Sequence, residues 1–298
     1  MLTLGATLRQ LRLTQRLTQD QLYGGIVSRS FAGRLERGDH EITTDKFFLI
    51  LDRLNVGADE FRYVQQGYQP TDAAILESQA ELAYDQQNFP WLRHLEQRYR
   101  DSQNPRQHQL AVVADVLIKT FGGTGWTPTP GMDLLYDQFN RCQTWNLNQI
   151  KLGTAWLAIA ALKRDPQLVL AGIDKMHASC DRYVSPKADP FQVMNQRMAF
   201  DMLALQVLLI THQYPAAKVF RGPLLATHRE FLNTDGEIQV QVMLCLWAWY
   251  FGDPQDGDHL AANLRTMPIT RGRANLLAIL TSYHPRANAY RAKREADQ

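Results

Sequence analysis

Residues 18–38, TQDQLYGGIVSRSFAGRLERG, constrain the fold more than any other part of this 298-residue chain. Thr18 can cap a first short helix, because its hydroxyl can accept a hydrogen bond from an amide three residues on. A Gly-Gly pair follows, and glycine tolerates the positive φ that a tight turn requires. Ser28 can cap a second helix, and Gly38 is placed to end it. The segment therefore predicts two short helices joined by a tight turn.

The second of these helices is predicted to have a buried side and a polar side. Helical spacing puts three residues on the buried side: Phe31, Ala32 and Leu35. The polar side carries Arg29 and Ser30 in the first turn, and Arg34 four or five residues further on. A helix that enters a major groove by its N-terminus would present these polar side chains to base edges. A bidentate Arg–guanine pair contributes about 1–3 kcal/mol of discrimination between bases.

Positive charge is concentrated around this segment. From Arg9 to Arg37 the chain has six arginines and only two acids, whereas beyond residue 70 it has 23 basic and 22 acidic residues. A locally basic patch on a nearly neutral chain is typical of a protein that binds phosphate. The alternative is a helical domain that only packs and whose arginines form a solvated face. The local excess of arginine favours DNA binding over that alternative.

The segment resembles the helix-turn-helix of the repressor (XRE/Cro) type. The resemblance implies base contacts from the polar side of the second helix. It also implies a phosphate contact from Gln19, where an amide side chain and a helix N-terminus meet. Glu36 is expected to pair inside the domain with Arg9 or Arg12. The candidate DNA contacts are Gln19, Ser28, Arg29, Ser30, Arg34 and Arg37.

The second helix departs from the repressor pattern at two positions. Ala32 stands where a larger aliphatic side chain is common. Gly33 follows it, and a glycine in a helix interior costs up to about 1 kcal/mol. We therefore expect this helix to be less stable than its counterparts.

Five helices are predicted in the first 66 residues. Leu4, Leu8 and Leu11 have helical spacing. A later helix is predicted to begin at residues 43–45, and its expected apolar face is formed by Phe47, Phe48, Ile50, Leu51 and Leu54. Asp59 can cap a short closing helix. The sequence thus predicts a repressor-like domain at residues 1–66, a polar linker at 67–72 and a second domain at 73–298.

Residues 73–298 are predicted to form helical hairpins, which makes the fold class all-α. Apolar residues recur at spacings of three and four, and strand-like alternation is rare. Five prolines are predicted to mark helix starts: Pro90, Pro130, Pro166, Pro215 and Pro254. Their spacings of 36 to 49 residues fit one helical hairpin and a loop. The sequence therefore predicts an α-solenoid of about five tetratricopeptide-like hairpins.

The combination of the two domains resembles the Rgg/GadR/MutR family of transcriptional regulators. Three segments carry the resemblance: LGATLRQLR, SRSFAGRLERGDHEIT and ILDRLNVGADEF. The resemblance implies a cytoplasmic homodimer that binds an inverted-repeat operator in double-stranded DNA. It also implies that a short signalling peptide, of the quorum-sensing type, binds the concave face of the solenoid and modulates transcription. Dimerisation is expected from the C-terminal end of the solenoid together with the DNA-binding domains.

Amide side chains suit the backbone of an extended peptide, because each amide both donates and accepts hydrogen bonds. The candidate peptide contacts are Asn140, Arg141, Gln192, Asn195, Gln196 and Gln239, with Gln241 on the same predicted helix as the last. A solvated polar face is the alternative for each of them. Three methionines at intervals of four, Met194, Met198 and Met202, are expected to belong to the core. At least one of Trp247 and Trp249 is also expected there.

The sequence favours a protein that is not an enzyme and has no cofactor. It contains no GxSxG, HExxH, P-loop or Rossmann fingerprint, and the glycine-rich segment at 122–125 is expected to be a loop. The three cysteines are far apart and have no metal-ligand spacing, so each is expected to be a small apolar residue without a metal. No apolar run approaches the roughly 18 residues of a membrane helix, and no signal peptide is recognised, so a cytoplasmic location is expected.

Two rival functions stay open at the level of sequence. One is a helical-repeat adaptor between proteins whose helix-turn-helix is vestigial. The other is a transcriptional regulator that responds to a signal other than a peptide. The first has no need to keep Arg29, Arg34 and Arg37, whereas the second would differ in the residues exposed on the concave face.

Overall fold

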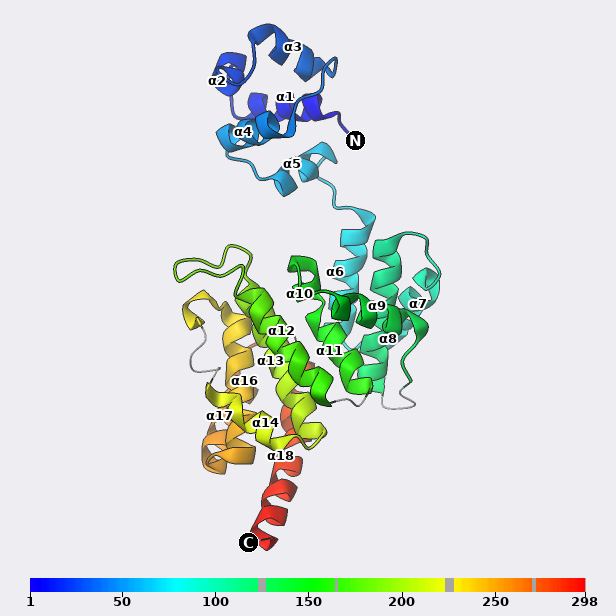
Figure 1. Ribbon diagram of the computed structural model, residues 1–298, viewed down its shortest axis with the longest axis vertical. Helices are drawn as coiled ribbons and strands as arrows, with labels where there is room; N and C mark the ends of the chain where they lie inside the picture. Colours follow the sequence, from blue (N-terminus) through cyan, green and yellow to red (C-terminus); the bar gives the residue numbers. More distant parts are fainter. Residues whose placement is uncertain (123–126, 164–165, 223–227, 270–271, 298) are drawn as a thin grey trace. The chain divides into compact units, whose positions relative to one another are not determined.

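The computed structural model describes residues 1–122, 127–163, 166–222, 228–269 and 272–297 (Figure 1). Helices form the regular structure of these residues, and no strand occurs among them, which confirms the all-α prediction. The chain divides into two compact units, Met1–Ser78 and Gln79–Gln298. The division falls inside helix α6 (Asp72–Asp85), whereas the expected linker, residues 67–72, lies between α5 and the start of α6. The glycine-rich segment at 122–125 lies outside the described residues except for its first glycine.

Unit 1 contains the five predicted helices, packed around one small core. They are α1 (Leu4–Thr14), α2 (Gln19–Tyr23), α3 (Arg29–Arg37), α4 (Thr44–Leu54) and α5 (Ala58–Gln65). The core is made of apolar residues at helical spacing, among them Leu8, Leu11, Leu22, Ala32, Leu35, Ile50, Leu51, Leu54, Phe61 and Val64. Gly5 lets α1 approach α3, because a Cβ at this position would lie 1.7 Å from the carbonyl oxygen of Leu35. The close approach fixes α3 against the rest of the domain.

Two local predictions for unit 1 are wrong. Phe48 was expected on the apolar face of α4, yet it is 50% exposed. Its neighbour Phe47 packs instead and makes an edge contact with Phe61, with 5.0 Å between ring centroids. Consecutive residues of a helix point about 100° apart, so Phe48 points away from the contact that Phe47 makes. Asp59 does not cap α5, since the helix begins one residue earlier with Gly57 as its cap. The carboxylate of Asp59 instead lies in the first turn, where its negative charge interacts favourably with the positive end of the helix dipole.

Unit 2 begins with the last part of α6 and contains the helical hairpins. Its other helices in the first half are α7 (Phe89–Tyr99), α8 (Pro105–Gly122), α9 (Pro130–Arg141), α10 (Leu147–Lys151) and α11 (Gly153–Leu162). The second half has α12 (Pro166–Cys180), α13 (Val193–Ile210), α14 (Tyr214–Val219), α16 (Thr234–Phe251), α17 (Pro254–Thr266) and α18 (Arg273–Ala296), with a short 3₁₀ helix at Arg229–Phe231. All five predicted prolines lie in the first turn of a helix. Proline suits that place because its missing N–H would have had no partner there.

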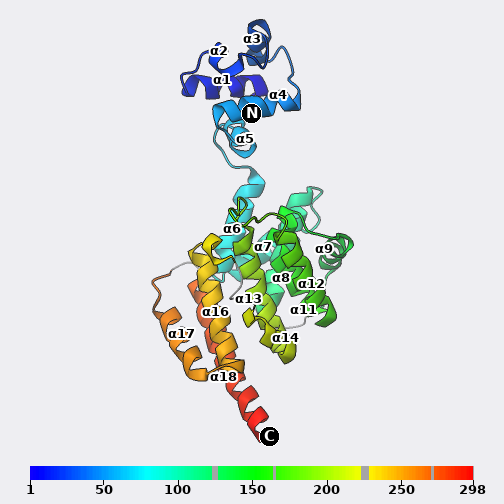
Figure 2. The same cartoon turned by 60° about the vertical axis from the view of Figure 1, so that its left-hand side comes forward.

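One row of helices runs through these hairpins by successive contacts. Helix α8 contacts α11, α11 contacts α13, α13 contacts α16, and α16 contacts α18. Helices α9, α12 and α17 pack against members of this row as their hairpin partners. Figure 2 shows α13, α16 and α18 running side by side. This stacking of hairpins confirms the predicted solenoid architecture.

The core of unit 2 is rich in aromatic side chains. Trp145 and Trp156 are both buried, and their ring centroids are 5.4 Å apart. Gly172 allows a close approach there, because a Cβ would lie 2.1 Å from the Trp156 ring. As predicted, Met194 and Met198 are buried, Met202 packs against the same core, and Trp249 is buried while Trp247 is half-buried.

Among the described residues, α13 is the single helix long and apolar enough to cross a membrane. Its window has a mean hydropathy of 1.2, and 56% of it is buried inside unit 2. Its contacts with α10, α11, α12, α14 and α16 account for that burial. The apolar character of α13 is therefore explained by its place in the core.

Two of the three cysteines are buried as predicted. Cys180 and Cys245 are fully buried, and burial raises the pKa of each thiol to about 12. Cys142 is only half-buried, at the end of α9, where its thiol donates to the carbonyl oxygen of Gln138. The two buried thiols therefore stay protonated near neutral pH and behave as small apolar groups.

Candidate nucleic-acid interface

Local capping chemistry builds the helix-turn-helix of unit 1. The Thr18 hydroxyl accepts a hydrogen bond from the amide of Gln21, and the Thr18 amide donates to the side-chain oxygen of Gln21, which forms a capping box at the start of α2. Ser28 caps α3 by accepting from the amide of Phe31 at 3.2 Å. Gly38 ends α3 with a φ of 85°, a left-handed conformation that favours glycine. These contacts confirm the start and end points predicted from the sequence.

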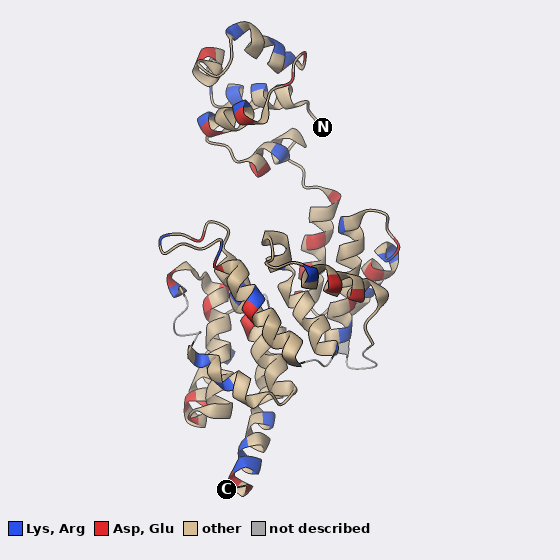
Figure 3. Cartoon of the chain, viewed as in Figure 1, with Lys and Arg blue, Asp and Glu red and all other residues tan. Residues whose placement is uncertain are grey.

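Helix α3 has the two-sided character that the sequence predicts. Ala32 and Leu35 are fully buried on one side. The exposed side chains at the other side are Ser28, Arg29, Ser30, Arg34 and Arg37. In Figure 3 the basic residues of α3 appear as blue segments along this helix. The arrangement leaves a continuous polar and cationic side for contact with another molecule.

The residues predicted to contact DNA differ in whether their side chains already bond to other parts of the protein. Arg29 and Arg34 are exposed, and neither forms an ion pair with another described residue. Arg37 pairs through its Nε with the Oδ2 of Asp39 at 2.9 Å, which offsets part of its charge. The hydroxyl oxygen of Ser28 accepts the capping bond, so its proton is the part left to donate.

Glu36 is the centre of a buried hydrogen-bond network that joins α1, α2 and α3. Its carboxylate accepts from Arg12 through Nε at 2.7 Å and through Nη2 at 2.9 Å. The Tyr23 hydroxyl donates to it at 3.0 Å, and the Gln19 amide donates at 2.9 Å. The expected partner is therefore Arg12 rather than Arg9. Burial opposes ionisation of Glu36, but the bonds from Arg12, Gln19 and Tyr23 outweigh it and hold its pKa below the usual range.

Gln19 keeps one side-chain donor free at the start of α2. It is the first residue of α2, and one hydrogen of its Nε2 bonds to Glu36, which leaves the second hydrogen free to donate. Gln19 and Arg29 line the same small hollow beside the turn between α2 and α3. The network thus orients an amide donor next to the first residue of α3.

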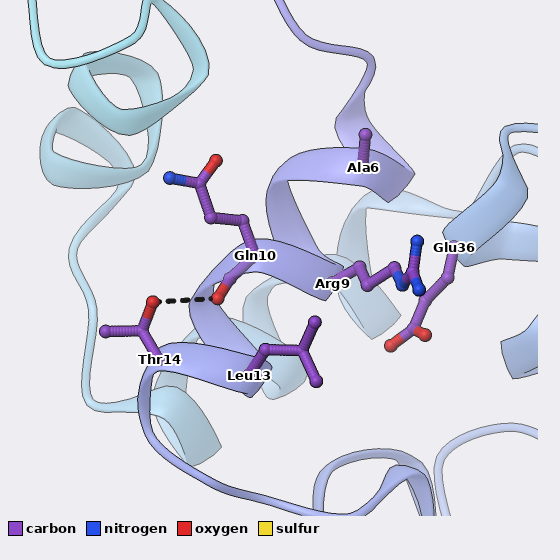
Figure 4. A pocket seen from close by; sticks show the side chains of 6 residues that line it. All are labelled: Ala6, Arg9, Gln10, Leu13, Thr14 and Glu36. Carbon is purple, nitrogen blue, oxygen red and sulfur yellow. Dashed lines mark hydrogen bonds between the residues drawn. The ribbon is translucent and has the colours of Figure 1, made fainter.

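A larger hollow of about 330 Å³ lies along α1, with Glu36 of α3 in its lining (Figure 4). Its lining residues are Ala6, Arg9, Gln10, Leu13, Thr14 and Glu36. The Thr14 hydroxyl donates to the carbonyl oxygen of Gln10, and the Glu36 carboxylate is already held by Arg12. The hollow therefore offers Arg9 as its one charged group not engaged in a described ion pair, and we assign no ligand to it.

Arg53 holds the turn before α3, a structural contact that the sequence did not predict. Its Nη1 donates to the carbonyl oxygens of Leu22 at 2.9 Å and Gly24 at 2.7 Å, at the end of α2. The bonds tie the end of α4 to the turn that precedes α3. The sequence around the turn does not predict this partner, because Arg53 is about thirty residues away in the chain.

The candidate peptide contacts fall on three helices of unit 2. Asn140 and Arg141 end α9, where the Oδ1 of Asn140 accepts from the Nε1 of Trp156 at 3.2 Å and Arg141 is exposed. Gln192, Asn195 and Gln196 lie at the start of α13, and Gln239 lies on α16. Helices α13 and α16 contact each other, whereas α9 packs on α8 and α11. The structure thus brings the α13 and α16 candidates to neighbouring helices and leaves the α9 pair apart.

Two of these amides have an unsatisfied atom. The Oδ1 of Asn195 accepts from the amide of Asn233, at the start of α16, at 2.9 Å, but its Nδ2 is buried without a partner. The Oε1 of Gln239 is also buried without a partner. A buried polar atom without a hydrogen bond is costly, so a further donor or acceptor at either atom would be stabilising.

No cluster of metal-ligating side chains occurs in the described ranges. In particular, no group of three His, Cys, Asp or Glu residues there could hold a metal ion. His177 bonds through its Nε2 to the buried Asp201 at 2.7 Å, and Arg197 pairs with the exposed Asp181 at 3.0 Å. These contacts join α13 to α12 and to the residue after it, so they have a structural explanation.

Unit 1 has the fold and the exposed basic helix of a helix-turn-helix domain. Residues 8–61 match the family described as Helix-turn-helix. No curated protein shows significant sequence similarity to the chain.

Solved structures extend the similarity to nearly the whole chain. A Listeria monocytogenes EGD-e protein, provisionally described as a transcriptional regulator, is 18% identical with a TM-score of 0.68 and 98% of both chains covered. The Streptococcus dysgalactiae SHP pheromone receptor Rgg2 is 18% identical with a TM-score of 0.64, covering 98% of this chain and all of its own. A bacterial peptide pheromone/receptor complex gives 13% identity and a TM-score of 0.62, covering 97% of this chain and 99% of the other. The chain therefore has the fold of Rgg-type regulators, as its sequence resemblance predicted.

Proposed function

We propose that this protein is a transcriptional regulator that binds double-stranded DNA through α3. The observation that best supports the proposal is the exposed cationic side of α3. This helix is the second of a helix-turn-helix in which both helices have side-chain caps and pack on one apolar core. Arg29, Ser30 and Arg34 would contact base edges, and Gln19 and Arg37 would contact the phosphate backbone. In a homodimer, two such helices would bind the half-sites of an inverted-repeat operator.

We further propose that unit 2 binds a short signalling peptide that changes the affinity for DNA. The solved neighbours that bear the names of a pheromone receptor and a peptide pheromone/receptor complex support this proposal through their shared fold. Asn195 and Gln239 support it chemically, since each has one buried amide atom in need of a partner. An extended peptide backbone supplies both donors and acceptors along its length. A cytoplasmic location fits a regulator that binds both DNA and such a peptide.

A direct binding measurement tests the proposed DNA binding. The full-length protein is titrated with the duplex upstream of its own gene and with a scrambled duplex, across a series of salt concentrations. We expect a clear preference for the first duplex and a steep decrease of affinity with salt, because released counterions contribute to binding. Weak binding without preference would favour an adaptor whose helix-turn-helix no longer binds DNA.

The peptide proposal has its own test. Synthetic peptides from short open reading frames beside the gene are titrated into the protein–DNA complex. A peptide that shifts the DNA affinity supports the proposal. A protein that binds its operator but ignores all such peptides would be a regulator of the non-peptide kind.

A further inference from the structure

Gly33 lies midway along α3 and is half-buried. Arg29 lies one helical turn before it and Arg37 one turn after it, while Ser30 and Arg34 flank it on the same side. All four of these neighbours are exposed. The position with no side chain is thus surrounded by the residues that we propose to contact DNA.

The fold of the protein does not require glycine at this position. A Cβ at Gly33 would meet the Nη1 of Arg37 at 3.7 Å, which is an ordinary van der Waals contact, and the backbone φ is not positive. Two other glycines of unit 1 differ in this respect. Gly5 has the carbonyl oxygen of Leu35 at 1.7 Å from its added Cβ, and Gly38 has a φ of 85°.

Most helical glycines of unit 2 also have packing reasons, with the exposed Gly222 as an exception. The five with a close neighbour, within or at the start of a helix, are Gly131, Gly153, Gly172, Gly236 and Gly257. A Cβ at any of them would lie between 2.1 and 3.2 Å from its nearest neighbour. Close packing inside the protein therefore explains these glycines, whereas it does not explain Gly33.

A glycine inside a helix lowers its stability relative to alanine, since it loses more backbone entropy on folding. Gly33 weakens α3, and no contact within the chain requires a glycine there. The absence of a side chain at this position therefore points to a close contact with a bound partner. An α-helix with its side chains is about 10–12 Å across, and the major groove of DNA is about 12 Å wide. A helix in the groove therefore has little spare room on the side that faces the bases.

We propose that Gly33 is a specificity-determining residue, at which the backbone of α3 approaches the DNA bases too closely for a side chain. The close approach brings Arg29 and Arg34 nearer to the base edges. It therefore contributes to the preference for one DNA sequence more than to the affinity for DNA in general. This inference rests on the proposed DNA-binding function and adds a position that has no side-chain contact of its own.

Two substitutions in the full-length protein test the inference, Gly33→Ala and Gly33→Leu. Gly57→Ala serves as the matched control, because a Cβ there would meet nothing within 4 Å, no glycine-only φ is required, and Gly57 lies outside α3. The duplex is one that the wild-type protein enriches from a randomised pool. Binding to this duplex and to a scrambled one is measured, together with amide hydrogen exchange of α3.

Stability and binding are expected to change in opposite directions. Gly33→Ala should slow hydrogen exchange in α3 and yet weaken binding to the enriched duplex about tenfold, comparable to the loss of one base contact. Gly33→Leu should weaken it by about a hundredfold or more, with much smaller losses on the scrambled duplex. Gly57→Ala should leave both affinities within about twofold, as expected away from the interface.

Two outcomes would overturn the inference, and they are distinguishable. If the wild-type protein enriches a sequence and Gly33→Ala binds it with unchanged affinity and preference, Gly33 does not mark a close approach. If the wild-type protein enriches no sequence and binds DNA without salt dependence, the proposed function itself is wrong, and the inference is lost with it.

Discussion

Single residues decide how α3 is held and what it presents. Glu36 and Arg12 form an ion pair whose side chains are only 4% and 10% exposed, so neither charge can be solvated if its partner is removed. Arg34 lies on the same helix as Glu36 but on its exposed side, where the protein gives it no partner among the described residues. One helix thus carries a carboxylate that stabilises the domain and a guanidinium available for a ligand.

Removal of the buried charge at Glu36 should destabilise unit 1. For Glu36→Gln we expect a loss of about 3 kcal/mol at pH 7, because Arg12 remains buried without a counter-charge. The pKa of Glu36 is lowered in the folded protein, so its contribution is present above the unfolded pKa of about 4.3 and is lost as the pH falls through the folded value. The difference between wild type and variant should therefore shrink below about pH 4.

Hydrogen exchange of α1, α2 and α3 in full-length protein measures this difference across pH. Glu60→Gln on α5 is a suitable control, because Glu60 is exposed. The same substitution on the surface typically changes the free energy of unfolding by less than about 0.5 kcal/mol. A loss of stability that stays constant from pH 7 to pH 3 would show that the charge of Glu36 is not its cause.

Arg34 and Gln19 should affect DNA binding in different ways. Arg34→Ala should weaken operator binding about 5- to 150-fold and relax the base preference at one position, as expected for a lost bidentate contact. Gln19→Ala should weaken binding to all duplexes alike, because a phosphate contact carries no sequence information. Competition between the operator and single-base variants measures both effects, with the exposed Arg62→Ala as control. An equal loss of preference in both variants would contradict the assignment of α3 to the groove.

Whole elements are placed by contacts that join distant parts of the chain. The turn after α2 depends on Arg53 from α4, whose guanidinium satisfies two carbonyl oxygens there. Helix starts depend on local chemistry instead, as the capping box of α2 and the prolines of α7, α9, α14 and α17 show. Local signals made the helix starts predictable, whereas the position of α3 relative to α4 required the tertiary contact.

Loss of the Arg53 contact should loosen the turn without unfolding the domain. For Arg53→Gln we expect about 1–2 kcal/mol less local stability, because two hydrogen bonds from a charged but exposed donor are lost. Amides of residues 24–27 should exchange faster and operator binding should weaken, while the overall helix content stays unchanged. Arg62→Gln, on the exposed side of α5, is the matched control. Normal exchange at the turn in Arg53→Gln would remove Arg53 from this role.

At the scale of the whole chain, two units with separate cores carry two proposed activities. The core of unit 1 is a small cluster of twelve buried residues, and unit 2 has its own aromatic and aliphatic core. Separate cores allow a substitution in unit 2 to change the response to a ligand and leave DNA binding intact.

Arg141→Ala tests this separation. We expect the peptide-induced change in DNA affinity to be lost, through peptide binding weakened by about 10- to 100-fold, because a charged donor to a peptide oxygen contributes about 1.5–3 kcal/mol. Operator binding without peptide should match the wild type. The exposed Arg98→Ala on α7 is the control. A normal peptide response in Arg141→Ala would exclude Arg141 from the peptide site and favour the amides of α13 and α16.

Sequence by itself determined the features of this protein that depend on neighbours along the chain. Caps at Thr18 and Ser28, the left-handed Gly38 and the proline helix starts follow from backbone chemistry within a few residues, and helical periodicity predicted the core of α3. Tertiary structure decided the rest. In the folded protein Glu36 pairs with Arg12 and not with Arg9, and Arg53 bonds to the turn after α2. Phe48 is exposed, and Asn195 bonds to the start of α16. Those outcomes depend on which helices pack together, because side chains far apart in sequence become partners only when packing brings them within hydrogen-bond distance.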